Sequence, residues 1–482
     1  MSASGRGTGG AETAPAPAYS HERRTPAARI RRSLAGASST PFWLDSSDRP
    51  DPEPALAGAT TADLLVVGGG YSGLWTALLA KEADPARDVV LIDAAEVAWA
   101  ASGRNGGFFE ASLTHGVENG ERHFADELPV LERLADENVA EFVATLERHG
   151  IDAEYEPAGT LTVATEPHQV EALRAGGAEG FYEGEALRQL IHSPVYRAAR
   201  LDRHGEALVH PAKLAWGLKE ACLRLGVRIH ERTAATALAR TASGVRVTTK
   251  GGQVEARQVV LATNGFPSLL KRTRLLTVPV YDYVLMTEPL TREQLEQIGW
   301  TERFGITDSS RQFHYYRKSA DDRILFGGYD AVYHAGGRIR PAYDQRAETF
   351  ETLADHFFTT FPQLDVRFTH AWGGMIDMCT RFVAFYGTAL GGRVAYSAGY
   401  TGLGVGATRF GAKVVLDLLG GTPTELTELK LVRATPLPMP PEPLATPAVA
   451  LMRAAIARSD ANGGHDGPLL RIMDAVGIGF DS

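Results

Sequence analysis

A strand, a glycine turn, a helix and a second strand follow one another between residues 63 and 93, and this order constrains the fold more than any other part of the sequence. The apolar run 63–67 is typical of a buried parallel strand, and the stretch 74–81 is typical of a helix. The turn between them carries three glycines at G-x-G-x-x-G spacing, Gly68, Gly70 and Gly73. The second apolar run, 89–92, ends in Asp93.

Each part of this pattern has a role in holding a dinucleotide. Gly68 permits a tight turn, Gly70 lets the backbone approach a pyrophosphate, and Gly73 lets the helix pack on the strand. The helix N-terminus offers unpaired N–H groups to the phosphates. Asp93 can accept hydrogen bonds from both ribose hydroxyls, and its charge disfavours NADP. Backbone sterics alone can also demand such glycines, but the complete pattern favours a site for NAD or FAD.

A second segment rich in small residues, 100–108, distinguishes between these two cofactors. A nicotinamide dehydrogenase has no need of such a loop after the acidic strand. A loop without bulky side chains can run its main chain along the far half of a dinucleotide and offer N–H groups to a flavin ring. An ordinary surface turn is the alternative for this loop taken alone. Together with the first motif, the loop favours FAD.

Six segments then carry a resemblance to a known family. They are 66–77 (VVGGGYSGLWTA), 101–108 (ASGRNGGF), 259–266 (VVLATNGF), 323–328 (RILFGG), 372–377 (WGGMID) and 394–406 (VAYSAGYTGLGVG). In this order they resemble the FAD-dependent oxidoreductases of the D-amino-acid, glycine and sarcosine oxidase superfamily, and most closely the γ-glutamylputrescine oxidoreductase-like branch. The resemblance covers roughly residues 41–421.

The resemblance implies an α/β fold with a discontinuous, Rossmann-like FAD-binding domain and a second, mixed-sheet substrate domain of the α+β kind. We expect the FAD-binding domain to comprise 41–112, 202–270 and 386–430, and the substrate domain 113–201 and 271–385. The residues expected to bind FAD are Gly68, Gly70, Tyr71, Ser72, Gly73, Asp93, Ala101, Ser102, Arg104, Asn105, Gly106, Gly107, Ala235, Thr263, Asn264, Gly265, Gly399, Thr401, Gly402, Leu403 and Gly404.

The loop 399–406 precedes a predicted helix, 407–419. A helix N-terminus carries partial positive charge. If it points at N1 and the C2 carbonyl of the flavin, as the resemblance implies, it stabilises the anionic reduced ring. A second phosphate loop for a separate nucleotide is the alternative, but the glycine spacing differs and no downstream strand ends in an acid.

The two ends of the chain differ in composition from the body. Residues 1–40 are rich in Ala, Gly, Ser, Pro and Arg, and we expect this extension to be disordered because it has few large apolar side chains to bury. Residues 431–482 are expected to form a proline-rich strap and a C-terminal helix, with Thr446 as its cap and Pro447 at its first position.

Composition excludes several kinds of partner. A net charge of −9 without a basic stripe argues against nucleic acid. The two cysteines, Cys222 and Cys379, predict no disulfide framework and show no metal-ligand spacing. No run approaches the roughly 20 apolar residues of a membrane span, so a cytoplasmic protein that binds small molecules is expected. The sequence leaves the oligomeric state open.

The family's chemistry is oxidation of a C–N bond. Hydride passes from the carbon that bears a neutral amine to flavin N5, and water hydrolyses the resulting imine. Burial in the pocket favours the free amine by penalising the ammonium. Oxygen or another acceptor then reoxidises the flavin, and the sequence leaves this choice open.

The usual carboxylate anchors of amino-acid-oxidising relatives are missing. Arginines bind carboxylates bidentately, but the corresponding positions carry Ile376 and Gly402. We therefore expect an amine substrate, including a polyamine derivative, rather than a free α-amino acid. The alternatives are an oxidase or dehydrogenase of a small amino acid and a non-catalytic flavin-binding protein. A flavin monooxygenase is disfavoured because neither a C-terminal Gly-Asp motif nor a second complete fingerprint is present.

Four residues are candidates for the chemistry. Asp377 either anchors a distal ammonium or pairs structurally with Arg381. Alternation along a strand sends His314 and Tyr316 to one face and Tyr315 to the other, so His314 or Tyr315 is expected to line the pocket unless it is core. Lys271 is a candidate for promoting oxygen attack, although an exposed lysine is the simpler interpretation. The surroundings of Cys379 do not match the sarcosine oxidase attachment pattern, which favours non-covalent FAD.

Overall fold

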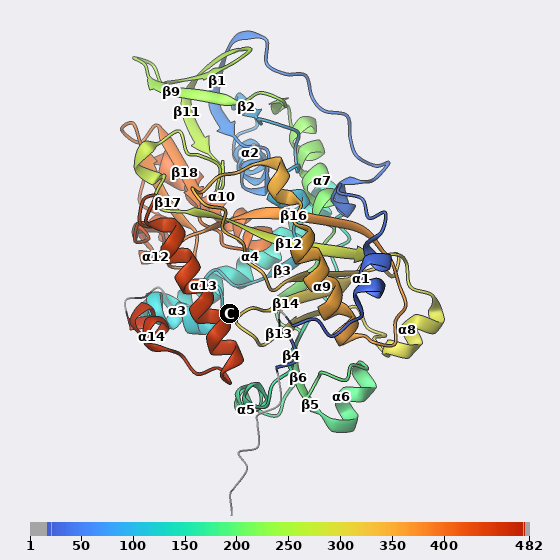
Figure 1. The fold of residues 1–482 in the computed structure, drawn as a ribbon. Coiled ribbons are helices and arrows are strands. Elements are labelled where there is room, and N and C mark those ends of the chain that lie inside the picture. Colours follow the sequence, from blue (N-terminus) through green and yellow to red (C-terminus); the bar gives the residue numbers. More distant parts are fainter. Residues whose placement is uncertain (1–16, 21, 476, 478–482) are drawn as a thin grey trace, which may run out of the picture.

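The computed structural model describes residues 17–20, 22–475 and 477. Two large sheets make up the core, and Figure 1 shows the strands of the first in the upper part of the molecule and those of the second below. The second sheet is mixed, so the expected α/β architecture with a second, mixed-sheet domain is confirmed. Along the part of the chain that the structure describes, no helix is both long and apolar enough to cross a bilayer.

The first sheet is built around β1, the first strand of the glycine motif. Its path is β17-β18-β11-β1-β2-β8, parallel except for β17, with β9 and β10 paired beyond β11. The strands are β1 (Gly58–Val67), β2 (Val89–Ile92), β8 (Arg228–His230), β9 (Ala235–Arg240), β10 (Val245–Thr249), β11 (Gly252–Leu261), β17 (Phe385–Ala389) and β18 (Val394–Ala398). Three separate stretches of sequence thus assemble one sheet.

Alternation along β1 explains how both faces of this sheet are covered. Leu64 and Val66 pack among residues of the helices, whereas Leu65 and Val67 pack among residues of β10 and β11. The helices on the first face are α2 (Tyr71–Ala83), α7 (Pro211–Arg224) and α10 (Gly404–Gly420), with α2 in contact with both others. Burial on both faces accounts for the nearly continuous apolar run of β1.

The second sheet has the order β16-β12-β15-β14-β13-β4-β6-β5. Its strands are β4 (Thr160–Ala164), β5 (Phe181–Glu183), β6 (Ala198–Asp202), β12 (Val278–Thr287), β13 (Gly305–Asp308), β14 (His314–Lys318), β15 (Ile324–Gly328) and β16 (Phe368–Met378). Helix α9 (Ala347–Thr360) packs on it through aromatic residues such as Phe357. The short helices α5 (Pro167–Ala175), α6 (Gly184–Leu190) and α8 (Arg292–Ile298) lie in its connections.

The segment that follows the second glycine cluster joins the nucleotide side of the molecule rather than the substrate side. A short ladder pairs β3 (Phe108–Glu110) with β7 (Glu206–Leu208), and α3 (Val117–Phe124) leads into α4 (Leu128–His149). Asn138 of α4 donates to the carbonyl of Gly406 in α10 at 3.1 Å. The expected substrate-domain segment 113–201 therefore begins with helices that share the core of the other domain, because the apolar face of α4 packs on α10.

The expectation of disorder for residues 1–40 is wrong over 17–20 and 22–40, and residues 1–16 and 21 lie outside the described residues. Helix α1 (Ala27–Leu34) packs against α9 and β16. Ile30 is buried in the core of the second sheet, and Tyr19 is buried against His314. These few apolar residues suffice because the surface of the second domain gives them a place to pack.

The C-terminal part of the chain returns along the outside of the molecule. It contains α11 (Glu425–Glu428), α12 (Lys430–Arg433), α13 (Ala445–Ala461) and α14 (Pro468–Ala475). The predicted cap is wrong, since α13 begins at Ala445 and Thr446 lies inside its first turn. The Thr446 hydroxyl instead donates to the carboxylate of Glu442 at 2.9 Å.

Candidate active site

The first glycine turn has the geometry that its spacing predicts. Gly68 has φ +119°, and a Cβ there would lie 2.3 Å from the carbonyl oxygen of Ala262. A Cβ on Gly73 would lie 1.8 Å from the carbonyl oxygen of Gly68, so only glycine lets α2 approach the strand end this closely. A Cβ on Gly70 would meet only the Ser102 hydroxyl, at 2.9 Å. Gly70 thus borders open space on its cavity side.

The groups around this turn suit a dinucleotide. The N-cap of α2 is Gly70, which has no side chain, and the Ser102 hydroxyl accepts from the N–H of Tyr71 at 3.0 Å. Gly70, Tyr71 and Ser72 line the cavity, so the partial positive charge of this helix end faces it. Asp93 ends the second strand, where its carboxylate accepts from the N–H groups of Gly69 at 2.6 Å and Ala95 at 2.7 Å. Burial raises the pKa of Asp93 above its ordinary value. The carboxylate lines the cavity, beside Thr233, Ala234 and Ala235.

The second glycine cluster is fixed from behind by two tryptophans. Trp43 Nε1 donates to the carbonyl of Asn105 and Trp372 Nε1 to the carbonyl of Arg104, each at 2.9 Å. The Arg104 guanidinium pairs with Asp344 at 2.7 Å. The W-G-G segment therefore holds the main chain of the small-residue loop against the cavity, while the Arg104 charge is neutralised by protein.

The loop after β18 forms the opposite wall. Gly402 has φ +102°, and a Cβ there would meet only His115, at 3.9 Å. No side chain caps α10, whose N-cap is Leu403. The largely buried imidazole of His115 borders the same space, and within the described chain its Nδ1 has no hydrogen-bond partner. Burial lowers the pKa of His115 to about 4, which leaves it neutral at neutral pH.

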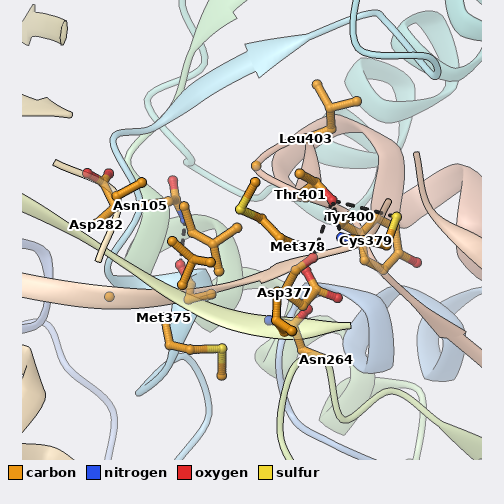
Figure 2. Close-up of a pocket in the computed structure, with 18 of the residues that line it drawn as sticks. Asn105, Asn264, Asp282, Met375, Asp377, Met378, Cys379, Tyr400, Thr401 and Leu403 are labelled. Atoms are coloured by element: carbon orange, nitrogen blue, oxygen red, sulfur yellow. Dashed lines mark hydrogen bonds between the residues drawn. The ribbon is translucent and has the colours of Figure 1, made fainter. Parts of the chain in front are cut away.

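These walls enclose a cavity of about 840 Å³. Most residues expected to bind the cofactor line it, namely Gly68, Gly70, Tyr71, Ser72, Asp93, Ala101, Ser102, Arg104, Asn105, Gly106, Ala235, Thr263, Asn264, Thr401, Gly402, Leu403 and Gly404. Gly73, Gly107, Gly265 and Gly399 stand behind this wall, where their lack of a side chain permits close packing. Figure 2 shows Asp282 and Asn105 on one side of the view and the loop from Tyr400 to Leu403 on the other.

Asp377 lies between these two sides, and the protein itself occupies its carboxylate. It accepts from the N–H of Gly399 and, with the amide nitrogen of Asn264 turned toward it, from Asn264 at 2.8 and 2.6 Å. The predicted pairing with Arg381 is wrong, because that guanidinium donates to carbonyls such as those of Ala384 and Leu431. Burial raises the pKa of Asp377 to about 7. Asp377 thus holds two cofactor loops together.

Tyr315 is the strand residue that reaches the cavity. Its hydroxyl donates to the carboxylate of Asp282 on β12, which is separated from β14 by β15, and we call this pair the Asp282–Tyr315 dyad. The ring lies against the small-residue loop, since a Cβ on Gly106 would be 2.7 Å from it. Burial raises the pKa of Asp282 to about 6, and the pKa of Tyr315 lies well above its ordinary value.

Two other candidates are placed away from the cavity. His314 is fully buried on the opposite face of the strand, where Nδ1 lies 2.7 Å from Asp308 and Nε2 lies 2.9 Å from His356. Its role there is to anchor the N-terminal segment, because His356 Nε2 bonds the carbonyl of Ser20 at 2.9 Å. Lys271 lies in an exposed turn outside the cavity wall, so it has no direct role there.

Three groups in the cavity wall were missed from the sequence. Asp282 is an acid in an otherwise apolar and aromatic strand, which is a signal that could have found it. Glu110 lies opposite Glu206 in the short β3–β7 ladder, and burial raises the pKa of both carboxyls, that of Glu206 to about 9. No feature of the sequence marks His115 as a site residue, because nothing in the sequence places its loop beside the loop that contains Gly402.

The arrangement of these groups defines the class of the protein. Two helix N-termini that border the cavity, a strand-end acid and open space at Gly70 and Gly402 fit an extended dinucleotide. The two glycine loops fit its pyrophosphate and ring ends. Nδ1 of His115, which has no hydrogen-bond partner among the described residues, is a polar group available to a bound molecule. This is a nucleotide-binding oxidoreductase fold with its cavity between two sheets.

Comparison with known proteins identifies the family to which the chain belongs. The model of the family DAO, FAD dependent oxidoreductase, matches residues 63–418, so the chain belongs to this family and is an FAD-dependent oxidoreductase. It is 30% identical over 397 residues to γ-glutamylputrescine oxidoreductase of Escherichia coli (strain K12), covering 79% of this chain and 88% of that protein. It is 26% identical to the sarcosine oxidase subunit beta of Rhizobium meliloti (strain 1021), covering 72% and 80%.

Solved structures show the same fold. Glycine oxidase from Geobacillus kaustophilus superimposes with a TM-score of 0.62 at 19% identity, covering 78% of this chain and 99% of that chain. L-proline dehydrogenase from P. horikoshii gives a TM-score of 0.60 at 18% identity, covering 77% and 96%. The resemblance read from the sequence is therefore confirmed at the level of family, fold and cofactor.

The environment of Cys379 predicts how the cofactor is held. The buried thiol donates to the carbonyl of Val383 at 3.2 Å, and burial raises its pKa, so little nucleophilic thiolate forms. We expect acid precipitation of the purified protein to leave a colourless pellet and free FAD in the supernatant, with the same result for Cys379→Ser. A yellow pellet that becomes colourless only in Cys379→Ser would contradict this expectation and indicate a covalent bond.

Proposed function

We propose that the protein oxidises the C–N bond of an amine and that the Asp282–Tyr315 dyad holds the reacting nitrogen. The observation that carries this proposal is the position of the dyad, inside the cofactor cavity and against the small-residue loop at Gly106. Because the Tyr315 hydroxyl donates its hydrogen bond to Asp282, its oxygen can still accept a hydrogen bond from a molecule in the cavity. An amine N–H is a suitable donor for that oxygen.

The protein's part in the reaction is to position and desolvate the amine. Apolar neighbours of the dyad, among them Phe313 and Val284, line the same space and disfavour an ammonium, so the amine that binds is neutral with its lone pair available. When bound, FAD supplies the chemistry by accepting hydride from the carbon next to nitrogen. Asp282 stays ionised and keeps its hydrogen bond from Tyr315, and the proton of the ammonium is left in the solvent.

The cationic side chains of the cavity wall support an amine over an α-amino acid. Ile376 and Gly402 line the cavity, at the two positions where the family resemblance implies carboxylate-binding arginines. Arg104 is paired with Asp344, Arg311 with Asp466 at 2.9 Å, and Arg453 with Asp330. A substrate carboxylate would therefore have to compete with a carboxylate of the protein for any of the three guanidinium groups.

A steady-state comparison tests the proposal. Primary and secondary amines and the small amino acids glycine, sarcosine and D-alanine are offered to the holoprotein with oxygen and, separately, with an artificial electron acceptor. We expect kcat/KM to be highest for an amine and the product to be an aldehyde. Higher kcat/KM for any of the three amino acids would contradict the amine proposal and favour a small-amino-acid oxidase, the kind of protein named among the relatives and neighbours.

A further inference from the structure

One face of helix α13 forms part of the cavity wall. The residues of α13 on this face are Ala445, Ala448, Val449, Met452 and Ile456, with Leu451 and Arg453 at its edges. Their spacing follows the i, i+3, i+4, i+7 periodicity of a single helical stripe. Helix α14 adds Leu469 and Met473. The face presented to the cavity by these two helices, which we call the α13–α14 wall, is therefore almost entirely apolar.

Polar contacts hold this wall in place. At one end of α13, Asp460 accepts from the N–H groups of Arg311 and Gln312 at 3.1 and 3.0 Å. Near its beginning, Glu442 accepts from the Tyr333 hydroxyl at 2.6 Å. Helix α14 is tied to α3 by the Asp474–Arg122 ion pair at 2.9 Å, and Figure 1 shows α14 beside α3.

The position of the wall along the chain separates it from the shared family architecture. The family match ends at residue 418, and α13 begins at Ala445. The same cavity extends from the cofactor loops past the dyad, through Phe313 and Tyr329, to this wall. A molecule that places its amine at the dyad therefore meets at its far end a surface that the chain adds outside the matched region.

We infer that the α13–α14 wall is a specificity subsite for the apolar tail of the substrate, so that the preferred amine carries an alkyl or aryl group rather than a second charge. This inference rests on the proposed amine oxidation. A distal ammonium against Val449 and Met452 would lose its hydration without a carboxylate to replace it. The acids of these two helices, Asp460 and Asp474, do not border the cavity, and Asp330 is paired with Arg346 and Arg453.

A series of primary n-alkylamines measures the subsite directly. Burial of each methylene is worth about 0.8 kcal/mol, so kcat/KM should rise about fourfold per added carbon until the wall is reached. 2-Phenylethylamine should be a good substrate, and putrescine should fall well below butylamine, which has the same chain length. A putrescine kcat/KM equal to or above that of butylamine would overturn the inference, whereas failure of every amine would overturn the proposed function instead.

Substitutions on α13 test whether the α13–α14 wall causes the dependence of kcat/KM on chain length. Met452→Asp should lower kcat/KM for hexylamine at least tenfold and leave kcat/KM for ethylamine within about twofold of the wild type. Met452→Ala, which adds no charge, should weaken the dependence of kcat/KM on chain length. Ala450→Asp is the matched control, because Ala450 is exposed on the same helix and does not border the cavity. Bound FAD per chain should be equal in all variants. An unchanged ratio of hexylamine to ethylamine in both Met452 variants would overturn the inference.

Discussion

Gly70→Asp is expected to abolish FAD binding while leaving the fold intact. A Cβ on Gly70 would meet only the Ser102 hydroxyl and no backbone atom, and the φ of −82° at Gly70 suits any residue. A carboxylate on residue 70 occupies the cavity space at the N-terminus of α2, where the account places the diphosphate of FAD. Two like charges at close range near a protein surface repel by up to about 4 kcal/mol, which is about a thousandfold in Kd.

The measurement is the ratio of FAD to protein after purification, followed by titration of the stripped protein with FAD. Gly420→Asp is the control, because Gly420 is exposed at the end of α10 with no atom within 4 Å of its Cβ position. FAD should raise the Tm of the wild type and of Gly420→Asp but not that of Gly70→Asp. Normal flavin content in Gly70→Asp would show that the diphosphate does not lie at the start of α2.

Asp282→Asn is expected to have the largest effect on turnover. The Tyr315 hydroxyl donates to Asp282, and a hydrogen bond to a charged group is worth about 1.5–3 kcal/mol. Its loss should lower kcat/KM for amines about 10- to 150-fold, since each 1.36 kcal/mol is a factor of ten. Tyr315→Phe should give a loss of the same size, and the double variant should be no worse than either single variant because the two residues act as a unit.

The pH dependence distinguishes this role from a structural one. The pKa of Asp282 is about 6 in the folded protein, raised by burial. The ionised form orients Tyr315, so kcat/KM should fall as the pH drops through about 6, in addition to the loss of free amine. Asp282→Asn should lack the fall near pH 6 while retaining its FAD. A break near pH 6 that persists in Asp282→Asn would remove Asp282 from the mechanism.

The cofactor site was largely predictable because its parts are local in sequence. The glycine spacing and the acid at the end of an apolar run describe backbone geometry directly, so Gly68, Gly73 and Asp93 follow from the sequence alone. The second glycine cluster can also be predicted from the sequence, but the contacts that hold its main chain in place cannot. Trp43 and Trp372 are distant in sequence from the carbonyls they bind, and only the folded chain brings them together.

The substrate side of the cavity was less predictable. Strand alternation shows which side chains share a face of the sheet, but not which elements pack on that face. The pattern of β14 correctly separated Tyr315 from His314, but only the packing of Tyr19 and α9 makes the His314 face core. Asp377 looked like a substrate anchor until Asn264 and the N–H of Gly399 filled its carboxylate. Helix α13 was expected as a helix, but its place on the cavity wall depends on long-range contacts.

The central claim is that FAD and an amine share this cavity, with the amine nitrogen at the Asp282–Tyr315 dyad. Anaerobic mixing of the holoprotein with an amine, followed by flavin absorbance in a stopped-flow instrument, tests it most directly. The account predicts complete bleaching of the oxidised flavin by an alkylamine, slowed at least tenfold in Tyr315→Phe with the same FAD content. Flavin that no amine bleaches, or bleaching at an equal rate in Tyr315→Phe, would contradict it.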